Sequence, residues 1–230
     1  MNVIYIPCFY KRGIDNELLQ KIVENLKEEK IGIFSVVQFS KNLKKIKKFL
    51  EDNNKKVFLG RSVKLGKVGQ VLGCDISSCE KIKEKVDCFL FIGSGIFHPI
   101  LVALKTNKDV YIANPLTKEV SKISRKEIEK FKRKNEENIR KFKNAKRIGI
   151  LVSTKPGQEN LKIALDIKKE IEKNNRKAFI FIFDTLIPEE LMNFTEIDAW
   201  VNTACPRIGI DDAERFDKPV INVEDFYAIV

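Results

Sequence analysis

The sequence predicts an α/β fold with two similar parallel-sheet domains joined by a basic helix, and three observations lead to it. Short apolar runs alternate with amphipathic stretches along the chain, as expected for strands separated by helices. Helices between consecutive apolar strands imply right-handed crossovers and therefore parallel sheets. Residues 3–26 and 148–171 share the order strand, polar loop and amphipathic helix, which indicates an internal duplication.

The first predicted domain spans residues 1–123 and contains Cys74. Its apolar runs predict strands at 3–7, 31–37, 56–60, 88–93 and 110–113. Its amphipathic stretches predict helices at 15–30 and 42–52, followed by a third helix that begins near residue 97.

The second predicted domain spans residues 147–230 and contains Cys205. Its predicted strands are 147–153, 177–183, 199–202 and 220–222, and its predicted helices are 158–173 and 188–193. Residues 124–146 between the two domains are expected to form the linking helix. One stripe of this helix is apolar, with Lys and Arg elsewhere; the stripe consists of Ile128, Phe131, Ile139 and Phe142.

The net charge of +11 is concentrated in one segment. Residues 121–147 contain twelve Lys or Arg and four Glu, which accounts for +8 of the total. This basic face is either a solvated surface or a surface that attracts an acidic partner or nucleic acid. Because the sequence lacks aromatic platforms and groove-reading motifs, nucleic acid is the partner we expect least.

Composition predicts a folded cytoplasmic protein. With 43% hydrophobic residues the chain can bury a packed core, and its longest apolar runs are too short to span a membrane. The first residues lack the pattern of a signal peptide, which predicts the reducing cytosol. The five cysteines are therefore expected to be thiols or metal ligands and not disulfides.

The cysteines divide into two kinds. Cys8 and Cys88 lie in or beside apolar strand sequences, where a cysteine is expected to be a small buried hydrophobic residue. Cys74 and Cys205 fall in loops that follow strands, at the edge of a parallel sheet where ligands bind. Their wide separation matches no local zinc or ferredoxin spacing, so spacing alone leaves a metal role open. Cys79 could form a zinc pair with Cys74, but no second pair follows to complete the site.

Four motifs carry a resemblance to a known family. They are GQVLGC at 69–74, GSGIFHP at 93–99, STKPGQ at 153–158 and DAWVNTACPRIGIDD at 198–212. In this order they resemble archaeal diphthamide synthase, the 2-(3-amino-3-carboxypropyl)histidine synthase of the first step of diphthamide biosynthesis.

The resemblance implies three similar α/β domains that each give one cysteine to a 4Fe-4S cluster, so that Cys74 and Cys205 are the expected metal ligands here. The iron left unsaturated by three thiolates binds S-adenosylmethionine. By a radical mechanism the family transfers the 3-amino-3-carboxypropyl group to a histidine of elongation factor 2. The implied assembly is a homodimer or a heterodimer with a paralogue.

The remaining motif residues are expected to bind the cofactor, and no catalytic residue is assigned. Gly93, Ser94 and Gly95 would offer backbone N–H groups to an anionic ligand, with His98 nearby; a tight turn and a helix cap are the ordinary alternatives. Gly157 and Gln158 would hold the polar end of S-adenosylmethionine, or form a helix N-terminus. Two further residues, Asp211 and Asp212, are expected to cap a helix or orient Arg207.

The sequence departs from the family in one respect. A first domain with its own cysteine is expected before Val3, and the third cluster ligand is therefore missing. The explanations are a truncated sequence or misplaced start codon, a short subunit that works beside a longer paralogue, or replacement of the ligand by Cys8 or Cys79. A non-catalytic partner subunit of a full-length paralogue is the alternative function.

Overall fold

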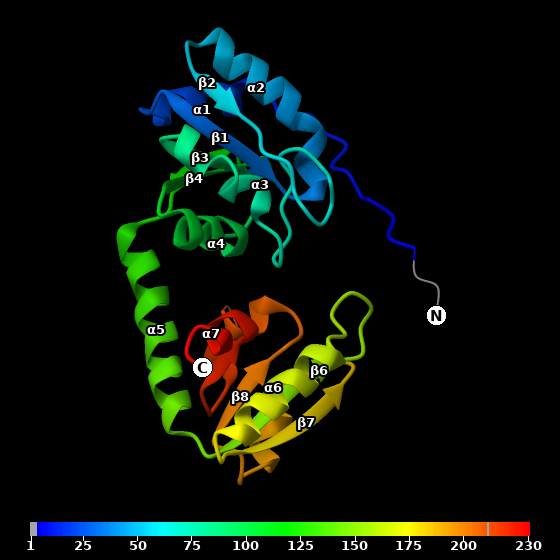
Figure 1. Ribbon diagram of the computed structural model, residues 1–230. Helices are drawn as coiled ribbons and strands as arrows, with labels where there is room; N and C mark the ends of the chain where they lie inside the picture. Colours follow the sequence, from blue (N-terminus) through cyan, green and yellow to red (C-terminus); the bar gives the residue numbers. More distant parts are fainter. Residues whose placement is uncertain (1–3, 211) are drawn as a thin grey trace. The chain divides into compact units, whose positions relative to one another are not determined.

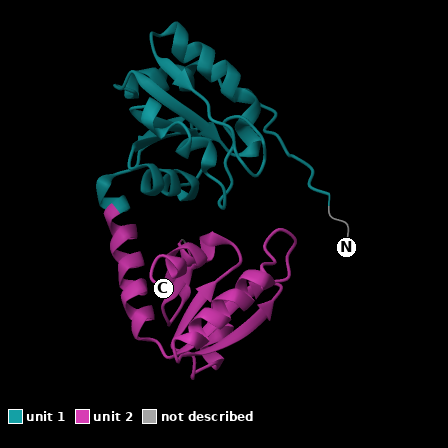
Figure 2. Cartoon of the chain, in the orientation of Figure 1, with its two compact units in different colours: residues 1–128 teal, residues 129–230 magenta. Residues whose placement is uncertain are grey.

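The computed structural model describes residues 4–210 and 212–230, and it divides the chain into two compact units. Unit 1 is Met1–Ile128 and unit 2 is Glu129–Val230, as coloured in Figure 2. Each unit contains one sheet with helices packed on it (Figure 1), and both sheets are mostly parallel, so the predicted α/β class is confirmed. No helix in the described residues combines the length and the apolar character that a membrane span requires.

Unit 1 contains a five-stranded sheet in the order β2-β1-β3-β4-β5. The first four strands are parallel, and β5 is antiparallel to β4. The bounds are β1 Lys30–Ser35, β2 Lys56–Phe58, β3 Cys88–Ile92, β4 Asp109–Asn114 and β5 Glu119–Lys122. The strand β5 was not predicted, because its exposed residues include a charge at each end and form no apolar run.

Both faces of the unit 1 sheet are buried, which explains why β1 and β3 read as continuous apolar runs. On one face Ile31, Ile33 and Leu90 pack with the apolar sides of α1 and α2. On the other face, the ring of Phe34 contacts the rings of Phe89 and Phe91. The helices are α1 Asn16–Asn25, α2 Leu43–Asp52, α3 Ser77–Glu80 and α4 Phe97–Thr106, with short 3-10 helices at Val37–Asn42 and Lys83–Lys85.

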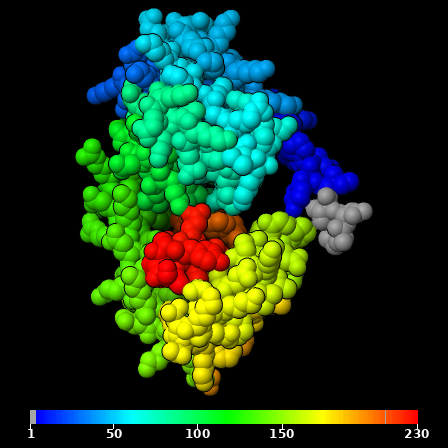
Figure 3. All heavy atoms as spheres, viewed as in Figure 1, coloured from blue at the N-terminus to red at the C-terminus, as the bar shows by residue number. Residues whose placement is uncertain are grey.

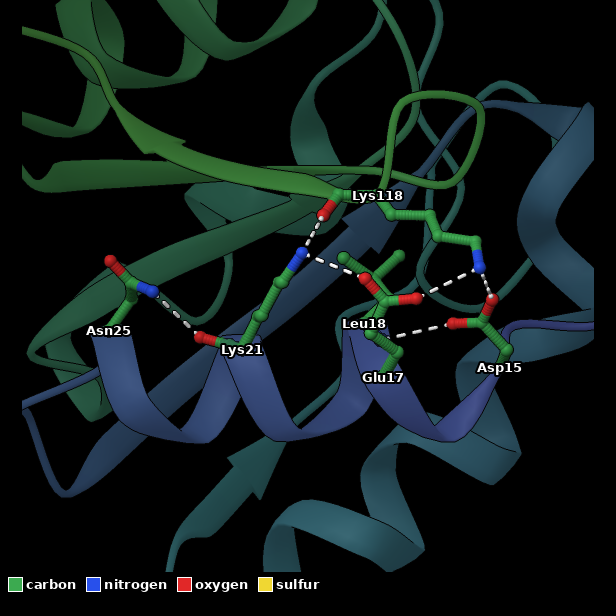
Figure 4. A network of polar contacts seen from close by, with 6 residues as sticks. All are labelled: Asp15, Glu17, Leu18, Lys21, Asn25 and Lys118. Carbon is green, nitrogen blue, oxygen red and sulfur yellow. Dashed lines mark hydrogen bonds and ion pairs between the residues drawn. The ribbon is translucent and has the colours of Figure 1, made fainter.

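The start of α1 is fixed to the turn between β4 and β5 (Figure 4). Asp15 caps the helix by accepting a hydrogen bond from Leu18 N at 3.0 Å. Lys118, in the left-handed region at φ 59°, forms ion pairs with Asp15 at 2.8 Å and Glu17 at 2.9 Å. Lys21 donates to the Lys118 carbonyl at 3.2 Å. The predicted helix at 15–30 therefore begins as expected but ends earlier, at Asn25.

The strand predicted at 3–7 is wrong over residues 4–7, and Val3 lies outside the described residues. Residues 4–10 have no strand assignment, and Ile4 and Ile6 are 85% and 80% exposed. Alternating apolar residues favour the strand conformation, but a strand also requires a neighbouring strand with which to pair. The unit 1 sheet begins instead with β1. The burial expected for Cys8 is wrong for the same reason, because this residue is exposed.

Unit 2 contains a four-stranded parallel sheet in the order β7-β6-β8-β9. Its strands are β6 Arg147–Ser153, β7 Lys177–Phe183, β8 Ala199–Asn202 and β9 Val220–Asn222. The α-helices are α5 Arg125–Asn144, which begins in unit 1, α6 Leu161–Lys173 and α7 Val223–Tyr227. Three 3-10 helices lie at Pro188–Asn193, Pro206–Gly209 and Asp212–Arg215.

The helix α5 packs by the predicted apolar stripe. Phe142 is buried against Phe226 with ring centroids 6.1 Å apart, and Ile139 packs on the same cluster. Lys134 forms an ion pair with Glu214 at 3.0 Å. Most other cations of α5 lie on its exposed side.

The two sheets have the same strand order, with β1, β2, β3 and β4 in the places of β6, β7, β8 and β9. Gly32 pairs with Phe89, as Gly149 pairs with Trp200. The duplication is therefore real, but the alignment of residues 3–26 with 148–171 is wrong in register. The unit 2 strand β6 corresponds to β1, and not to the segment before α1.

Candidate functional site

The GQVLGC loop lies at the carboxyl end of β1. Ser35 N donates to Gly69 O at 2.8 Å, and Val71 N donates to Ser35 O at 3.0 Å, so the loop continues the sheet for a short distance. Gly69 has φ +67°, and a Cβ there would lie 2.5 Å from Leu43 Cδ1, which restricts the position to glycine. The chain then turns, and Cys74 is exposed at this turn.

Asp75 holds the turn that presents Cys74. Its buried carboxylate accepts hydrogen bonds from the hydroxyls of Ser62 and Ser77 and from Lys64 N at 3.0 Å. Burial alone would raise the pKa of Asp75, but the hydrogen bonds from Ser62, Ser77 and Lys64 outweigh it and lower the pKa to about 2. The residue after Cys74 is therefore an ionised anchor for the loop.

The GSGIFHP motif joins the carboxyl end of β3 to α4, next to the GQVLGC loop. Gly95 has φ +78°, and Phe97 and His98 form the first turn of α4. A Cβ on Gly73 would lie 2.7 Å from Phe97 Cε1, so the two motifs are in direct contact. His98 stacks on Phe91 with ring centroids 6.1 Å apart. Unit 1 thus brings Cys74 and the 93–99 motif to the same end of its sheet.

In unit 2, Cys205 follows β8 in a turn held by buried polar side chains. Asn202 Nδ2 donates to Cys205 O at 2.8 Å and to Asn222 Oδ1 at 2.7 Å, while its Oδ1 accepts from Ala204 N at 3.0 Å. Thr203 Oγ1 donates to Leu151 O at 2.8 Å. Cys205 itself is half-buried and immediately precedes the 3-10 helix Pro206–Gly209.

The STKPGQ loop follows β6, the neighbour of β8, and is tied to the Cys205 loop by Asn160. This side chain donates to Gln158 O at 3.4 Å and to Thr203 O at 2.7 Å. Gly157 has φ +80°, and α6 begins only at Leu161, three residues later than predicted. Unit 2 therefore places residues 153–158 and Cys205 at the carboxyl ends of adjacent strands.

The burial of the cysteines separates possible ligands from core residues. Cys79 and Cys88 are almost fully buried, and burial raises the pKa of both thiols. A protonated buried thiol is a poor metal ligand, so the structure argues against Cys79 both as a zinc partner of Cys74 and as the third cluster ligand. Cys88 is a core residue, as predicted. Cys74 and Cys205 fit thiolate ligation by their position in loops. Within residues 4–210 and 212–230, no group of three or more His, Cys, Asp or Glu could hold a metal ion.

Several residues that shape these loops were not singled out from sequence. Asp75 directly follows Cys74, and Asn202 ends the strand before Cys205, so proximity to the cysteines was the available signal. Asn160 donates to Thr203 O and Asn222 donates to Pro206 O. Both residues are far in sequence from the loop that they bind, so proximity to a cysteine could not indicate them. Of the two predicted capping residues, Asp211 lies outside the described residues, and Asp212 opens a 3-10 helix.

Comparisons with known proteins agree with these features. The family described as "Putative diphthamide synthesis protein" matches residues 1–230. The chain is 36% identical to 2-(3-amino-3-carboxypropyl)histidine synthase of Pyrococcus horikoshii, covering 96% of this chain and 64% of the relative. It is 30% identical to the synthase of the same name from Methanocaldococcus jannaschii, covering 98% of this chain and 61% of the relative.

A crystal structure of Dph2 from Pyrococcus horikoshii with a 4Fe-4S cluster shares the fold. The TM-score is 0.82 at 34% identity, and the match covers 96% of this chain and 63% of that chain. The chain thus spans less than two thirds of the length of these relatives. On the whole-chain family match and the identity to archaeal synthases, this chain belongs to the diphthamide synthesis protein family.

Proposed function

We propose that this chain takes part in the first step of diphthamide biosynthesis, the transfer of a 3-amino-3-carboxypropyl group from S-adenosylmethionine to a histidine of elongation factor 2. One observation carries the proposal. Each unit presents one accessible cysteine at the carboxyl edge of its parallel sheet, beside a second loop with a glycine at positive φ. This is the edge at which α/β sheets bind ligands.

In this proposal Cys74 and Cys205 each give one thiolate to a 4Fe-4S cluster. The relative from Pyrococcus horikoshii is described with such a cluster, and the two thiols fit its ligand chemistry. When bound, the cluster supplies an electron to the sulfonium of S-adenosylmethionine. A three-cysteine site needs one more thiolate, which another domain or a paralogous subunit would provide.

The chain's own residues would position the cofactor and the loops. Ser94 and Gly95 are exposed at the end of β3, where their backbone N–H groups can bind the carboxylate of S-adenosylmethionine. In unit 2, Gly157 and the side chain of Gln158 would contact the polar end of S-adenosylmethionine, because Gln158 N already donates to Lys155 O at 3.0 Å. Asp75 and the amides around Cys205 would hold the two thiols in fixed turns.

Reconstitution under anaerobic conditions with iron and sulfide tests the ligands. The protein should gain a broad absorption in the blue, and Cys74→Ala and Cys205→Ala should each reduce it. Cys88→Ala is the matched control, because the same atoms are removed from a buried thiol that the proposal does not use. Iron bound equally by Cys74→Ala and Cys88→Ala would contradict the proposal.

The reaction itself is tested with S-adenosylmethionine labelled in the aminocarboxypropyl carbons. Incubation of reduced, reconstituted protein with archaeal elongation factor 2 should transfer label to one histidine, with a full-length paralogue added where the chain alone is inactive. Dependence on Cys74 and Cys205 in that mixture distinguishes participation in the site from a purely structural role. Transfer that is unaffected by both substitutions would exclude the proposed role.

A further inference from the structure

The passage between β2 and α3 lies at the surface of unit 1 (Figures 1 and 3) and contains a loop of fixed shape, residues 61–68. The two ends of the loop form an antiparallel bridge between Arg61 and Val68. Within it, Ser62 N donates to Lys67 O at 2.9 Å. The backbone of loop 61–68 is therefore held by its own hydrogen bonds and needs no partner to keep its conformation.

The exposed part of loop 61–68 is basic and apolar. Val63 is 64% exposed, and Val68 is 44% exposed. Three exposed cations flank the two valines: Arg61, Lys64 and Lys67. None of these cations forms an ion pair with a described residue, and the sequence has no exposed acid between positions 53 and 79. The loop thus presents a small apolar surface surrounded by unpaired positive charge.

The carboxylate that holds the Cys74 turn also holds loop 61–68. Asp75 accepts hydrogen bonds from the hydroxyl of Ser62 and from Lys64 N, the latter at 3.0 Å. Because Asp75 directly follows Cys74 in the chain, the loop and the exposed thiol are held in a fixed relation to each other. A protein that binds the loop is therefore brought close to Cys74.

Unit 2 shows that the fold does not require this loop. The strand β7 occupies the place of β2, and only residues 184–187 separate its end from the next 3-10 helix. In unit 1, residues 59–76 separate β2 from α3. The GQVLGC motif accounts for part of this longer connection, but not for loop 61–68. Long connections in compact domains are commonly functional, which indicates a role for the loop beside Cys74.

We propose that loop 61–68 is the docking site of a small acidic protein that carries one electron to the site at Cys74. This inference rests on the function proposed above, in which an electron has to reach a 4Fe-4S cluster. The carrier is oxidised by one electron and the cluster gains that electron, while no bond forms or breaks. Carboxylates of the carrier contact the three cations of the loop, and its apolar residues cover the two valines.

The size and charge of the loop favour an electron carrier over a larger protein partner. Electron-transfer proteins form small, transient interfaces that bury less than about 1,200 Å² in total. Charges around such a contact speed association, because they steer an oppositely charged protein to the surface. Three unpaired cations around two exposed valines fit that arrangement. A stable complex with a large substrate protein would need a wider apolar surface.

Binding of a small acidic ferredoxin to the metal-free protein tests the docking surface without any reaction. The affinity, measured by calorimetry, should fall as salt is added, and Lys64→Glu with Lys67→Glu should weaken it about tenfold or more. The bond from Lys64 N to Asp75 does not involve the substituted side chain. Lys27→Glu with Lys85→Glu is the matched control, since both residues are exposed and directly precede the amino ends of β1 and β3, at the opposite end of the sheet. Absence of binding, or equal weakening by the two double variants, would overturn the proposal.

Reduction of the reconstituted protein separates docking from the proposed reaction. Bleaching of the cluster absorption by reduced ferredoxin should slow about tenfold when Lys64 and Lys67 are both replaced by Glu. Bleaching by dithionite, a small reductant that needs no docking site, should be unchanged at an ionic strength that screens surface charge. Equal slowing with both reductants would overturn the proposal.

Two other outcomes distinguish this inference from its alternatives. A protein that forms no cluster, or whose cluster dithionite does not reduce, would contradict the function proposed above, and the binding test with metal-free protein would still decide on the docking surface. If the double variant at 64 and 67 weakens binding of elongation factor 2 and leaves reduction by ferredoxin unchanged, the loop binds the protein substrate and the carrier proposal is excluded.

Discussion

Asn202 offers the sharpest test of how the Cys205 loop is held. Its side chain is 2% exposed and forms three hydrogen bonds, to Cys205 O, Asn222 Oδ1 and Ala204 N. Asn202→Ala removes all three bonds and leaves their half-buried partners without replacement. A hydrogen bond of this kind contributes about 1 kcal/mol, so the expected loss in the free energy of unfolding is about 3 kcal/mol.

The sequence contains a single tryptophan, Trp200, buried in β8 two residues before Asn202, so its fluorescence reports the unfolding of unit 2. Urea unfolding followed by this signal gives the free energy of that unit. Asn174→Ala is the control, because the Asn174 side chain donates to Glu170 O at an exposed helix end. Its expected loss is about 0.5 kcal/mol.

The same variant should also change the reactivity of Cys205. Released from Asn202, the turn should open and the half-buried thiol should react faster with an alkylating agent, as measured by mass spectrometry of the metal-free protein. Cys74, in unit 1, serves as the internal reference and should keep its rate. A loss below about 1 kcal/mol together with an unchanged Cys205 rate would refute the assignment of Asn202 as the residue that holds this loop.

Three further outcomes follow from the structure. Asp75→Asn should cost the metal-free protein about 2 kcal/mol at neutral pH. Because the pKa of Asp75 is lowered from 3.8 to about 2, this stabilisation is complete above its unfolded pKa and disappears as the pH falls from about 4 to 2, which urea midpoints across that range would show. Gly149→Ala places a Cβ 2.1 Å from the buried Trp200 ring and should cost about 1–3 kcal/mol, whereas Gly13→Ala, with nothing within 4 Å, should change stability little in the same urea assay. Asn175→Ala should cost about 1 kcal/mol, since the residue has φ 56°, and Asn175→Gly should recover the loss in thermal unfolding.

Where a strand reads as a continuous apolar run, the sequence predicted it well. The strands β6, β7, β8 and β9 have the predicted bounds, and β6 and β8 are buried along almost their whole length, as is typical of parallel strands between helices. Hydrophobic periodicity gave the wrong prediction where strand pairing determines whether a segment joins the sheet. Residues 4–7 alternate like a strand but have no strand assignment, and β5 lacks an apolar pattern yet pairs with β4. Strand partners are long-range contacts, which local propensity does not contain.

The candidate site was accessible from sequence only in part. The expectation that Cys74 and Cys205 follow strands in loops could be made from the flanking residues, and so could the burial of Cys88. The groups that fix the loops could not be found in this way. Asp75 bonds to Ser62, and Asn160 bonds to the carbonyl of Thr203, through contacts that depend on the folded sheet.

The duplication explains the sheets but not the placement of both cysteines. Counted from the paired positions Phe89 and Trp200, the residue of unit 1 that corresponds to Cys205 is Ser94, in the GSG turn after β3. Cys74 instead comes from the passage after β2, which returns to the end of β1 through the hydrogen bonds of Ser35. Each unit therefore has a cysteine at the carboxyl ends of its parallel strands, but the two cysteines come from loops that do not correspond in the repeat. An alignment of the two halves that was correct in register would still have assigned the thiol of unit 1 to the wrong loop, so the motif around Cys74 and not the repeat identifies it.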